Sequence, residues 1–249
     1  MSDVLELAEN ANAYTPLRQG EDRIATGRYV LWLGRGAGPG SNVAQRFRFD
    51  AGDLDAVREE IHRHVRARGR SACSWEVGTH ARPADLVERL HSLGVVDDQP
   101  DALAVGMVLT EAPPGPSAGV EVRRAETTDE IRLASRIAAV AFGGSPPEDE
   151  PPPHSDYAVY LAYVDGEPVA RASVAFSGLG GTLFGGATLP DARGRGAYRA
   201  LVAARWAEAV ARGTPLLVTQ AGAMSRPILA GLGFRAVCEI RILVDDFGR

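Results

Sequence analysis

Residues 188–198, TLPDARGRGAY, decide the fold, because they join a strand to a long helix through a turn rich in glycine and arginine. The first amides of a helix lack partners within the helix and carry partial positive charge. Such a helix start is suited to bind an anion, and a pyrophosphate in particular. Gly194 and Gly196 have no Cβ and let the backbone approach a phosphate closely. Arg193 and Arg195 can add charge-assisted hydrogen bonds.

Other phosphate-binding loops fit this turn less well. No Gly-Lys-Ser/Thr follows it, and its spacing is not that of the dinucleotide fingerprint GxGxxG. Residues 34–40, GRGAGPG, come closer to that fingerprint, but Pro39 breaks the spacing and a predicted strand at 42–49 follows instead of a helix. We therefore predict a hairpin loop at 34–40. The alternative for residues 188–198 is a strand–helix turn that binds no ligand.

The elements around this turn alternate between strands and helices. Thr127 and Glu130 form a capping-box pattern, and Asp165-Gly166 is a hairpin turn signal. The periodicity predicts strands at 120–124, 157–164, 168–176, 182–189, 216–219 and 234–244, and helices at 128–142, 196–212 and 225–232. On the helix 196–212 we expect a solvent face of Arg205, Glu208 and Arg212 and an apolar face of Val202, Trp206 and Val210.

A fainter copy of this order lies in the first half of the chain. Ala-Arg-Gly occurs at 67–69 and at 211–213, and Arg-Pro at 82–83 and at 226–227, both with an offset of 144 (212 − 68 and 226 − 82). Leu-Gly occurs at 93–94 and at 232–233, with an offset of 139. The matches indicate an internal duplication, although common dipeptides can also recur by chance.

The stretch 112–119, APPGPSAG, is the best linker candidate, since it is uncharged and rich in proline, glycine and serine. It divides the chain into a first domain at 1–111 and a second domain at 120–249.

Composition limits the classes of function. A net charge of −5 and a pI near 5.6 disfavour a nucleic-acid partner. Cys73 and Cys238 have neither disulfide-framework nor zinc-site spacing, so we expect a reduced, cytoplasmic protein. The uncharged stretch 172–189 is broken by glycines and fits two strands better than a membrane span, and we expect no membrane partner.

The second half resembles the GCN5-related N-acetyltransferases. Arg193, Gly196 and Tyr198 occupy the fixed positions of that family's acyl-CoA signature, Arg/Gln-x-x-Gly-x-Gly/Ala. Residues 188–190 resemble its fourth strand, and residues 232–234, Leu-Gly-Phe, resemble its signature after the fourth helix. The resemblance covers residues 120–244. It implies an α/β (α+β) fold in which helices flank a mixed central sheet, here as a tandem form with a degenerate first half.

The resemblance also implies a site. The residues that it places at acetyl-CoA, the co-substrate, are Thr188, Leu189, Arg193, Gly194, Arg195, Gly196, Ala197 and Tyr198. The backbone amide of Thr188 or Leu189 would stabilise the tetrahedral oxyanion. No metal is expected. In the first half, the stretch at 49–53, FDAGD, puts two acids where phosphate would lie, so we expect that half to bind no CoA.

Three positions depart from the family pattern. Tyr198 replaces the last glycine or alanine of the signature. Gly222 and Leu229 stand where many relatives carry an asparagine and a tyrosine general acid, so the usual acid is missing.

The remaining catalytic candidates are Ser225 as a proton donor to the thiolate, and Glu239 or His154 as the base. Each has a structural alternative, namely a helix cap, a solvent-facing strand residue and a surface loop residue. Glu148, Asp149 and Glu150 could attract a cationic acceptor, or form an ordinary solvated charge run.

Taken together, the sequence predicts an acetyl-CoA-dependent N-acetyltransferase that acts on an amine-bearing acceptor as a monomer or homodimer. The alternatives are a non-catalytic acyl-CoA-binding or regulatory protein on the same fold, and an interaction domain with no affinity for CoA.

Overall fold

The computed structural model describes residues 3–116, 118–147 and 151–248. These form two compact units. The first contains the residues up to 107 together with 220–227 and 236–248, and the second contains 108–219 and 228–235. Two segments from the second half of the sequence therefore pack within the first unit.

The first unit is built on a mixed sheet. Its strands follow the order β1 (Asp22–Ala25), β2 (Val30–Leu33), β3 (Asn42–Gln45), β4 (Ala72–Gly78), β12 (Arg235–Asp246) and β6 (Leu103–Leu109), and β5 (Val96–Asp97) also pairs with β12. The pair β3–β4 is parallel, whereas β2–β3 is antiparallel, which confirms the predicted hairpin loop at 34–40. Strand β12 pairs antiparallel with the whole of β4. The strand that comes last in the sequence thus lies inside the first unit's sheet.

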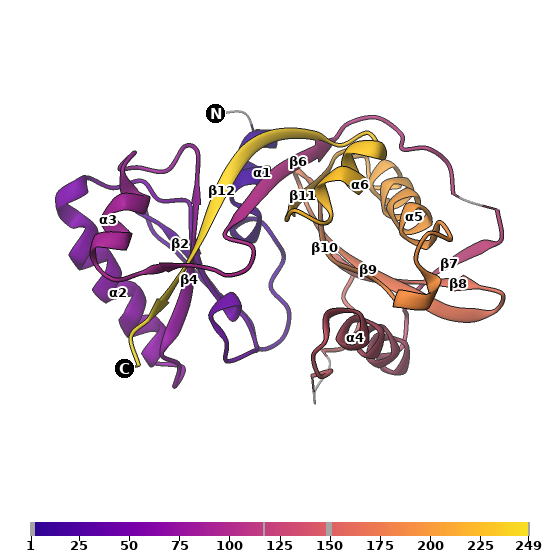
Figure 1. The fold of residues 1–249 in the computed structure, drawn as a ribbon, viewed down its shortest axis with the longest axis horizontal. Coiled ribbons are helices and arrows are strands. Elements are labelled where there is room, and N and C mark those ends of the chain that lie inside the picture. Colours follow the sequence, from indigo (N-terminus) through magenta and orange to yellow (C-terminus); the bar gives the residue numbers. More distant parts are fainter. Residues whose placement is uncertain (1–2, 117, 148–150, 249) are drawn as a thin grey trace. The chain divides into compact units, whose positions relative to one another are not determined.

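Helices cover both faces of this sheet (Figure 1). Helix α2 (Leu54–Arg66) and helix α3 (Leu86–Ser92) pack on one face, and α1 (Asp3–Glu9) lies on the other. An apolar stripe of α2 is buried in the core of this unit, and its members are Leu54, Val57, Ile61 and Val65.

The second unit has the strand order β11 (Leu217–Ala221), β10 (Gly180–Thr188), β9 (Glu167–Ser177), β8 (Tyr157–Val164) and β7 (Val120–Arg124). The pair β10–β11 is parallel and the others are antiparallel. Helices α4 (Thr128–Phe142) and α5 (Ala197–Ala211) lie on opposite faces (Figure 1), and the short helix α6 (Arg226–Gly231) follows β11. This confirms the predicted fold class, a mixed sheet flanked by helices.

The residues of the predicted helix cap and of the predicted hairpin turn form these structures. Thr127 caps α4, accepting from the Glu130 amide at 3.3 Å, while the Glu130 carboxylate accepts from the Thr127 amide at 2.9 Å. Asp165 and Gly166 form the β8–β9 turn with φ of 54° and 84°. The uncharged stretch 172–189 forms β9 and β10. None of the helices in the described residues is long and apolar enough to span a bilayer.

The predicted faces of α5 are wrong at Arg205 and Val210. Arg205 is only 1% exposed, whereas Val210 is 49% exposed. The long side chain of Arg205 lies under the helix, where Nε donates to the Leu201 carbonyl at 2.9 Å and Nη1 to the Ser173 carbonyl at 3.2 Å. Burial lowers the pKa of this guanidinium. Because two carbonyls accept from its guanidinium, Arg205 can be buried at a position that the helical pattern predicts to face solvent.

The two halves of the chain share irregular features as well as element order. Arg46 in β3's continuation and Gly185 in β10 both have left-handed backbone, with φ of 58° and 53°. Gly69, which follows α2, and Gly213, which follows α5, also have left-handed backbone, with φ of 68° and 75°. Matching irregularities at matching places support the internal duplication.

Candidate functional site

The turn between β10 and α5 presents backbone amides that the helix itself does not use. After β10 the chain makes one 3-10 turn (Pro190–Ala192) and enters α5 at Ala197. The helix's first hydrogen bond runs from the Ala200 amide to the Gly196 carbonyl at 3.1 Å. The amides of Ala197, Tyr198 and Arg199 precede it and have no acceptor within the helix. This helix start therefore has the donors of an anion site.

Glycine keeps the turn open. Gly194 has φ of +79°, and a Cβ placed on it would meet no described atom within 4 Å. Arg193, Gly194 and Arg195 are all exposed. A ligand can therefore reach the backbone of the turn from solvent.

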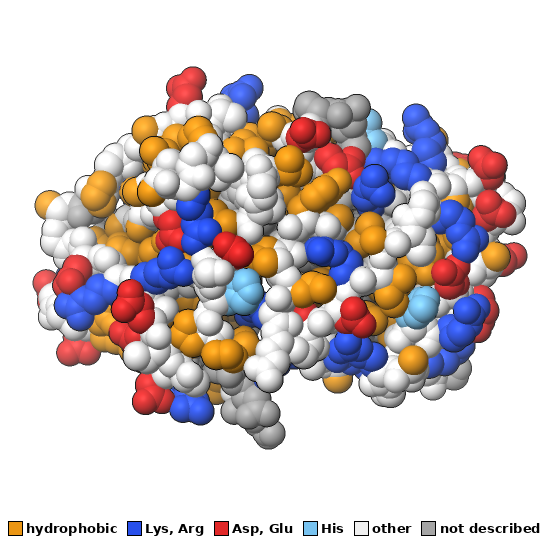
Figure 2. Space-filling model, turned by 180° about the vertical axis from the view of Figure 1, so that it is seen from behind, with side chains coloured by type: hydrophobic (Ala, Val, Ile, Leu, Met, Phe, Trp, Pro, Cys, Tyr) orange, Lys and Arg blue, Asp and Glu red, His pale blue; other side chains and the backbone are white. Residues whose placement is uncertain are grey.

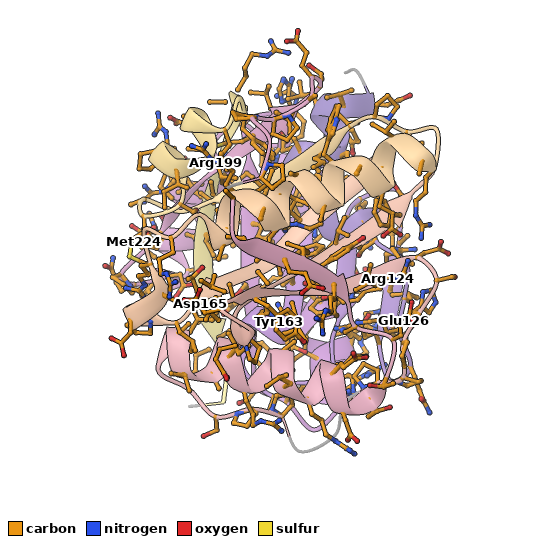
Figure 3. All side chains as sticks on the ribbon, turned by 90° about the vertical axis from the view of Figure 1, so that its right-hand side faces the viewer. Arg124, Glu126, Tyr163, Asp165, Arg199 and Met224 are labelled. Atoms are coloured by element: carbon orange, nitrogen blue, oxygen red, sulfur yellow. The ribbon has the colours of Figure 1, made fainter. Side chains whose placement is uncertain are left out.

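Three arginines surround this opening, and the sequence prediction missed one of them. Arg193 Nε lies 3.5 Å from the Thr188 carbonyl. Arg195 Nη2 lies 2.5 Å from Oδ2 of Asp165 in the β8–β9 turn. Arg199, on the first turn of α5, is exposed and pairs with no described carboxylate (Figure 3). The sequence could have indicated Arg199, because it lies three residues after Gly196, in the first turn of the helix. A cation there can bind the same anion as the helix amides.

Beside the turn, β10 and β11 separate. Their register contains only Gly181↔Leu217 and Thr182↔Val218, although β10 continues to Thr188. The edge of β10 that faces β11 is therefore unpaired with it over most of its length.

The Thr188 amide faces this free edge, and the Leu189 amide does not. Leu189 donates to the Val169 carbonyl at 2.9 Å, and Thr188 stands opposite Ala170 in the β9–β10 register. Hydrogen bonding alternates along an antiparallel strand, so Thr188 directs its amide away from β9. Of the two predicted oxyanion donors, Thr188 has the suitable orientation and Leu189 is already occupied.

The Tyr198 ring lies against β10 at Gly186. A Cβ on Gly186 would come within 2.5 Å of the ring's Cε2 atom. On its other side, the Arg205 guanidinium carbon lies 6.0 Å from the ring centroid. The missing side chain at Gly186 thus makes room for a large residue at this signature position.

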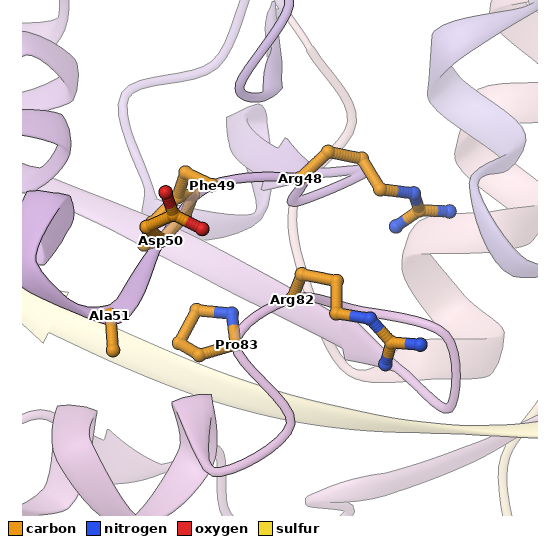
Figure 4. A pocket seen from close by; sticks show the side chains of 6 residues that line it. All are labelled: Arg48, Phe49, Asp50, Ala51, Arg82 and Pro83. Carbon is orange, nitrogen blue, oxygen red and sulfur yellow. The ribbon is translucent and has the colours of Figure 1, made fainter.

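The matching place in the first unit has a different lining. There, β3 leads to a 3-10 turn (Ala51–Asp53) and α2, and the Phe47 ring stacks on Trp75 with centroids 4.9 Å apart. A shallow pocket of about 280 Å³ remains, lined by Arg48, Phe49, Asp50, Ala51, Arg82 and Pro83 (Figure 4). Asp50 lies beside the start of α2, where it opposes binding of a phosphate. That the first half binds no CoA stays a prediction.

Solved structures resemble the whole chain. A GCN5-related N-acetyltransferase from Kribbella flavida matches with a TM-score of 0.72 and 20% identity, over 98% of this chain and 96% of that one. A tandem GNAT protein from the clavulanic acid biosynthesis pathway, solved without AcCoA, matches with a TM-score of 0.59 and 15% identity, over 100% of this chain and 89% of that one. A putative GNAT acetyltransferase from Novosphingobium aromaticivorans matches with a TM-score of 0.56 and 17% identity, over 97% and 95%.

The chain has the GCN5-related N-acetyltransferase (GNAT) fold. The match to a tandem GNAT protein over the full chain supports the duplicated arrangement. No protein-family model matches the sequence, and no curated protein matches it.

The catalytic candidates lie in different units of this GNAT fold. In the second unit, His154 Nδ1 accepts from the Asp156 amide at 3.0 Å and so helps to hold the turn before β8. In the first unit, the Ser225 hydroxyl donates to the Gly222 carbonyl at 3.3 Å, and Glu239 is exposed on β12. Described hydrogen bonds connect none of the three to residues 188–198. Glu148, Asp149 and Glu150 lie outside the described residues.

Tyr160 is unsuited to act as an acid in this GNAT fold. Its hydroxyl donates to Glu208, and burial, followed by this bond, raises its pKa. Tyr157 donates to the Ser173 hydroxyl at 3.1 Å.

A carboxylate–imidazole pair in the first unit was not predicted. Glu9 on α1 has a side chain only 1% exposed, and its Oε2 lies 2.6 Å from His80 Nδ1. Its Oε1 accepts from the His80 amide at 3.1 Å. The two residues are 71 positions apart, so no local pattern could indicate the pair. This arrangement fixes the imidazole, whose side chain is 43% exposed.

Charge is mixed on the face of the molecule that Figure 2 displays. Figure 2 shows acidic and basic side chains interspersed on the face that it displays, with no large field of one sign. That face lacks the basic patch typical of nucleic-acid binding. The described residues contain no group of three or more potential metal ligands.

Proposed function

We propose that this chain is an acetyl-CoA-dependent N-acetyltransferase whose second unit binds the co-substrate and whose acceptor carries an amine. The observation that supports this most is the start of α5, where the amides of Ala197, Tyr198 and Arg199 lack helical acceptors beside an open glycine turn. These amides suit the pyrophosphate of CoA, with Arg193 and Arg199 adding charge.

The separation of β10 from β11 suits the rest of the co-substrate. An extended acyl-pantetheine arm can pair with the free edge of β10 as an added strand would. The Thr188 amide on that edge is then placed to donate to the oxygen of the thioester as negative charge develops there. The attacking amine must first lose a proton, because alkyl ammonium groups titrate near 10.

A non-catalytic acyl-CoA-binding protein is the second candidate. Leu229, at the position of the usual tyrosine acid, is 1% exposed and carries no proton donor. Gly222, at the position of the usual asparagine, offers no side chain, and a Cβ there would lie 2.6 Å from Oδ2 of the exposed Asp101 side chain, which would have to move. Acetyl transfer to a panel of small and peptidyl amines separates the two candidates, because only the enzyme releases free CoA.

Calorimetric titration with acetyl-CoA tests the site itself, using Gly194→Asp and Gly194→Asn. Both side chains tolerate the left-handed backbone at Gly194, and they differ by one charge. We expect Gly194→Asn to keep measurable affinity and Gly194→Asp to lose at least about tenfold more, because a carboxylate competes for the helix amides.

Thermal unfolding serves as the control that both variants fold. Equal affinities of the two variants would show that charge at this turn does not matter. A native protein that binds no acetyl-CoA would contradict both candidate functions.

A further inference from the structure

We propose that Asp165 acts as an electrostatic gate on this site, holding Arg195 in an ion pair that a phosphate group of acyl-CoA must displace. The inference rests on the proposed function and adds a residue that the GNAT signature does not contain. It makes Asp165 a determinant of how tightly, and at what ionic strength, the phosphates are held.

The contact joins two separate elements of the second unit. Arg195 belongs to the turn before α5, and Asp165 lies 30 residues earlier, at the tip of the β8–β9 hairpin (Figure 3). Among the described residues, Arg195 is the one arginine of the turn that pairs with a carboxylate. Arg193 contacts a backbone carbonyl and Arg199 is exposed to solvent. The carboxylate of Asp165 therefore pairs with Arg195 alone among the three arginines near the turn.

The hairpin does not require this negative charge. Asp165 has φ of 54°, a conformation that asparagine and glycine adopt as readily as aspartate. An Asn-Gly turn would close the same hairpin. The carboxylate is thus separable from the fold, which makes its function open to test.

The pair is also weak enough to be displaced. The side chains of Arg195 and Asp165 are 46% and 79% exposed. Exposed pairs of this kind change an equilibrium by about twofold to fivefold. A pyrophosphate or phosphate carries more than one charge and has the three helix amides of residues 197–199 nearby, so it offers Arg195 a stronger partner.

The decisive experiment is a double-mutant cycle measured by calorimetric titration with acetyl-CoA at low ionic strength. Asp165→Asn should tighten binding by about twofold to fivefold, because Arg195 no longer has to leave a carboxylate. Arg195→Gln should weaken binding. In the Arg195→Gln background, Asp165→Asn should have no further effect.

A matched variant controls for general charge. Glu167→Gln removes one exposed negative charge two residues away, and we expect it to leave the affinity unchanged. Weaker binding by Asp165→Asn would show that the carboxylate positions Arg195 instead of restraining it, and would overturn the proposal. Equal tightening with and without Arg195 would also overturn it, since the effect would then be general repulsion.

A second ligand identifies the phosphate that Arg195 takes up. If dephospho-CoA abolishes the gain from Asp165→Asn, Arg195 binds the 3′-phosphate, and if the gain persists, Arg195 binds the pyrophosphate. Either result supports the gate. A native protein without acetyl-CoA affinity contradicts the proposed function, whereas binding that ignores Asp165 contradicts the gate alone.

Discussion

Glu76 is a partly buried carboxyl group of the first unit. It lies on β4, and its Oε2 atom is buried without a hydrogen-bond partner among the described residues. Burial raises its pKa to about 7, and a hydrogen bond from Gln220 opposes the rise. Gln220 occupies the position of Glu76 in the second half, at the offset of 144. Two residues separated by the offset of 144 therefore meet at one polar contact.

We expect Glu76→Gln to stabilise the protein at pH 8 and to have little effect at pH 5. The ordinary pKa of 4.5 applies in the unfolded chain, so the folded state holds this proton more tightly and loses stability as pH rises from about 4.5 to 7. The gain at pH 8 is up to about 3 kcal/mol. Urea unfolding at both pH values measures it, with the exposed Glu239→Gln as control. If Glu76→Gln raised the free energy of unfolding equally at both pH values, the raised pKa of Glu76 would be contradicted.

At the scale of elements, Asp245 fastens β12 to α2. Its carboxylate accepts from Arg58 Nη2 and Nε at 2.7 and 2.8 Å and lies 2.7 Å from His62 Nε2. The His62 ring stacks on Phe247 with centroids 3.8 Å apart. Burial favours the neutral carboxyl, but the bonds from Arg58 and His62 outweigh it and hold the pKa of Asp245 at about 2.

Asp245→Asn should destabilise the first unit by about 2 kcal/mol at neutral pH, because the depressed pKa measures how strongly the fold favours the carboxylate. This contribution is present above the ordinary pKa of 3.8 and disappears as pH falls toward 2. Urea unfolding at pH 7 and pH 3 should show the difference between native and variant protein shrinking.

The exposed pair of Glu59 with Arg66 provides the comparison. Glu59→Gln should cost less than about 1 kcal/mol at either pH. An Asp245→Asn variant as stable as this control at pH 7 would show that the bonds to α2 do not hold the strand.

Elements with local signals could be predicted from sequence, and contacts across the chain could not. The capping residues Thr127 and Glu130 lie three positions apart, and the turn at Asp165-Gly166 needs only two residues. In contrast, Arg58 meets Asp245 across 187 positions. Arg205 was misplaced for a related reason, since its burial depends on the Ser173 carbonyl, which is 32 positions away. The anion site could be predicted because all the backbone donors that we propose for it lie in one continuous turn.

At the scale of the whole molecule, the sequence indicated two related halves but not that segments of the second half pack within the first unit. The linker at 112–119 and the offset of 144 both point to a simple division. The structure instead gives residues 236–248 to the first unit, where β12 pairs with β4 from Ala72 to Gly78. Strand pairing depends on which edge is free in three dimensions, and the alternating pattern of β12 carries no information about its partner.

Deleting residues 236–249 should therefore damage the first unit, although they follow the second in the sequence. The deletion removes the neighbour of β4 and uncovers a core that includes Leu243 and Trp75. We expect hydrogen exchange to show lost protection in residues 72–78 and retained protection in β8 and β9. A peptide of residues 235–249 added in trans should restore part of it. Unchanged protection in 72–78 would show that the first unit does not depend on β12.

Strand β12 is synthesised last, so the sheet of the first unit stays incomplete during most of translation. Between Met107 and Ala236 the ribosome must add the 128 residues 108–235, which takes roughly 6–26 s at bacterial and eukaryotic elongation rates. During that interval β4 has an open edge, and such edges recruit foreign strands. On a crowded polysome, the matching strand of a neighbouring nascent chain fits that edge as well as the chain's own. A domain-swapped dimer is thus the characteristic assembly error of this connectivity.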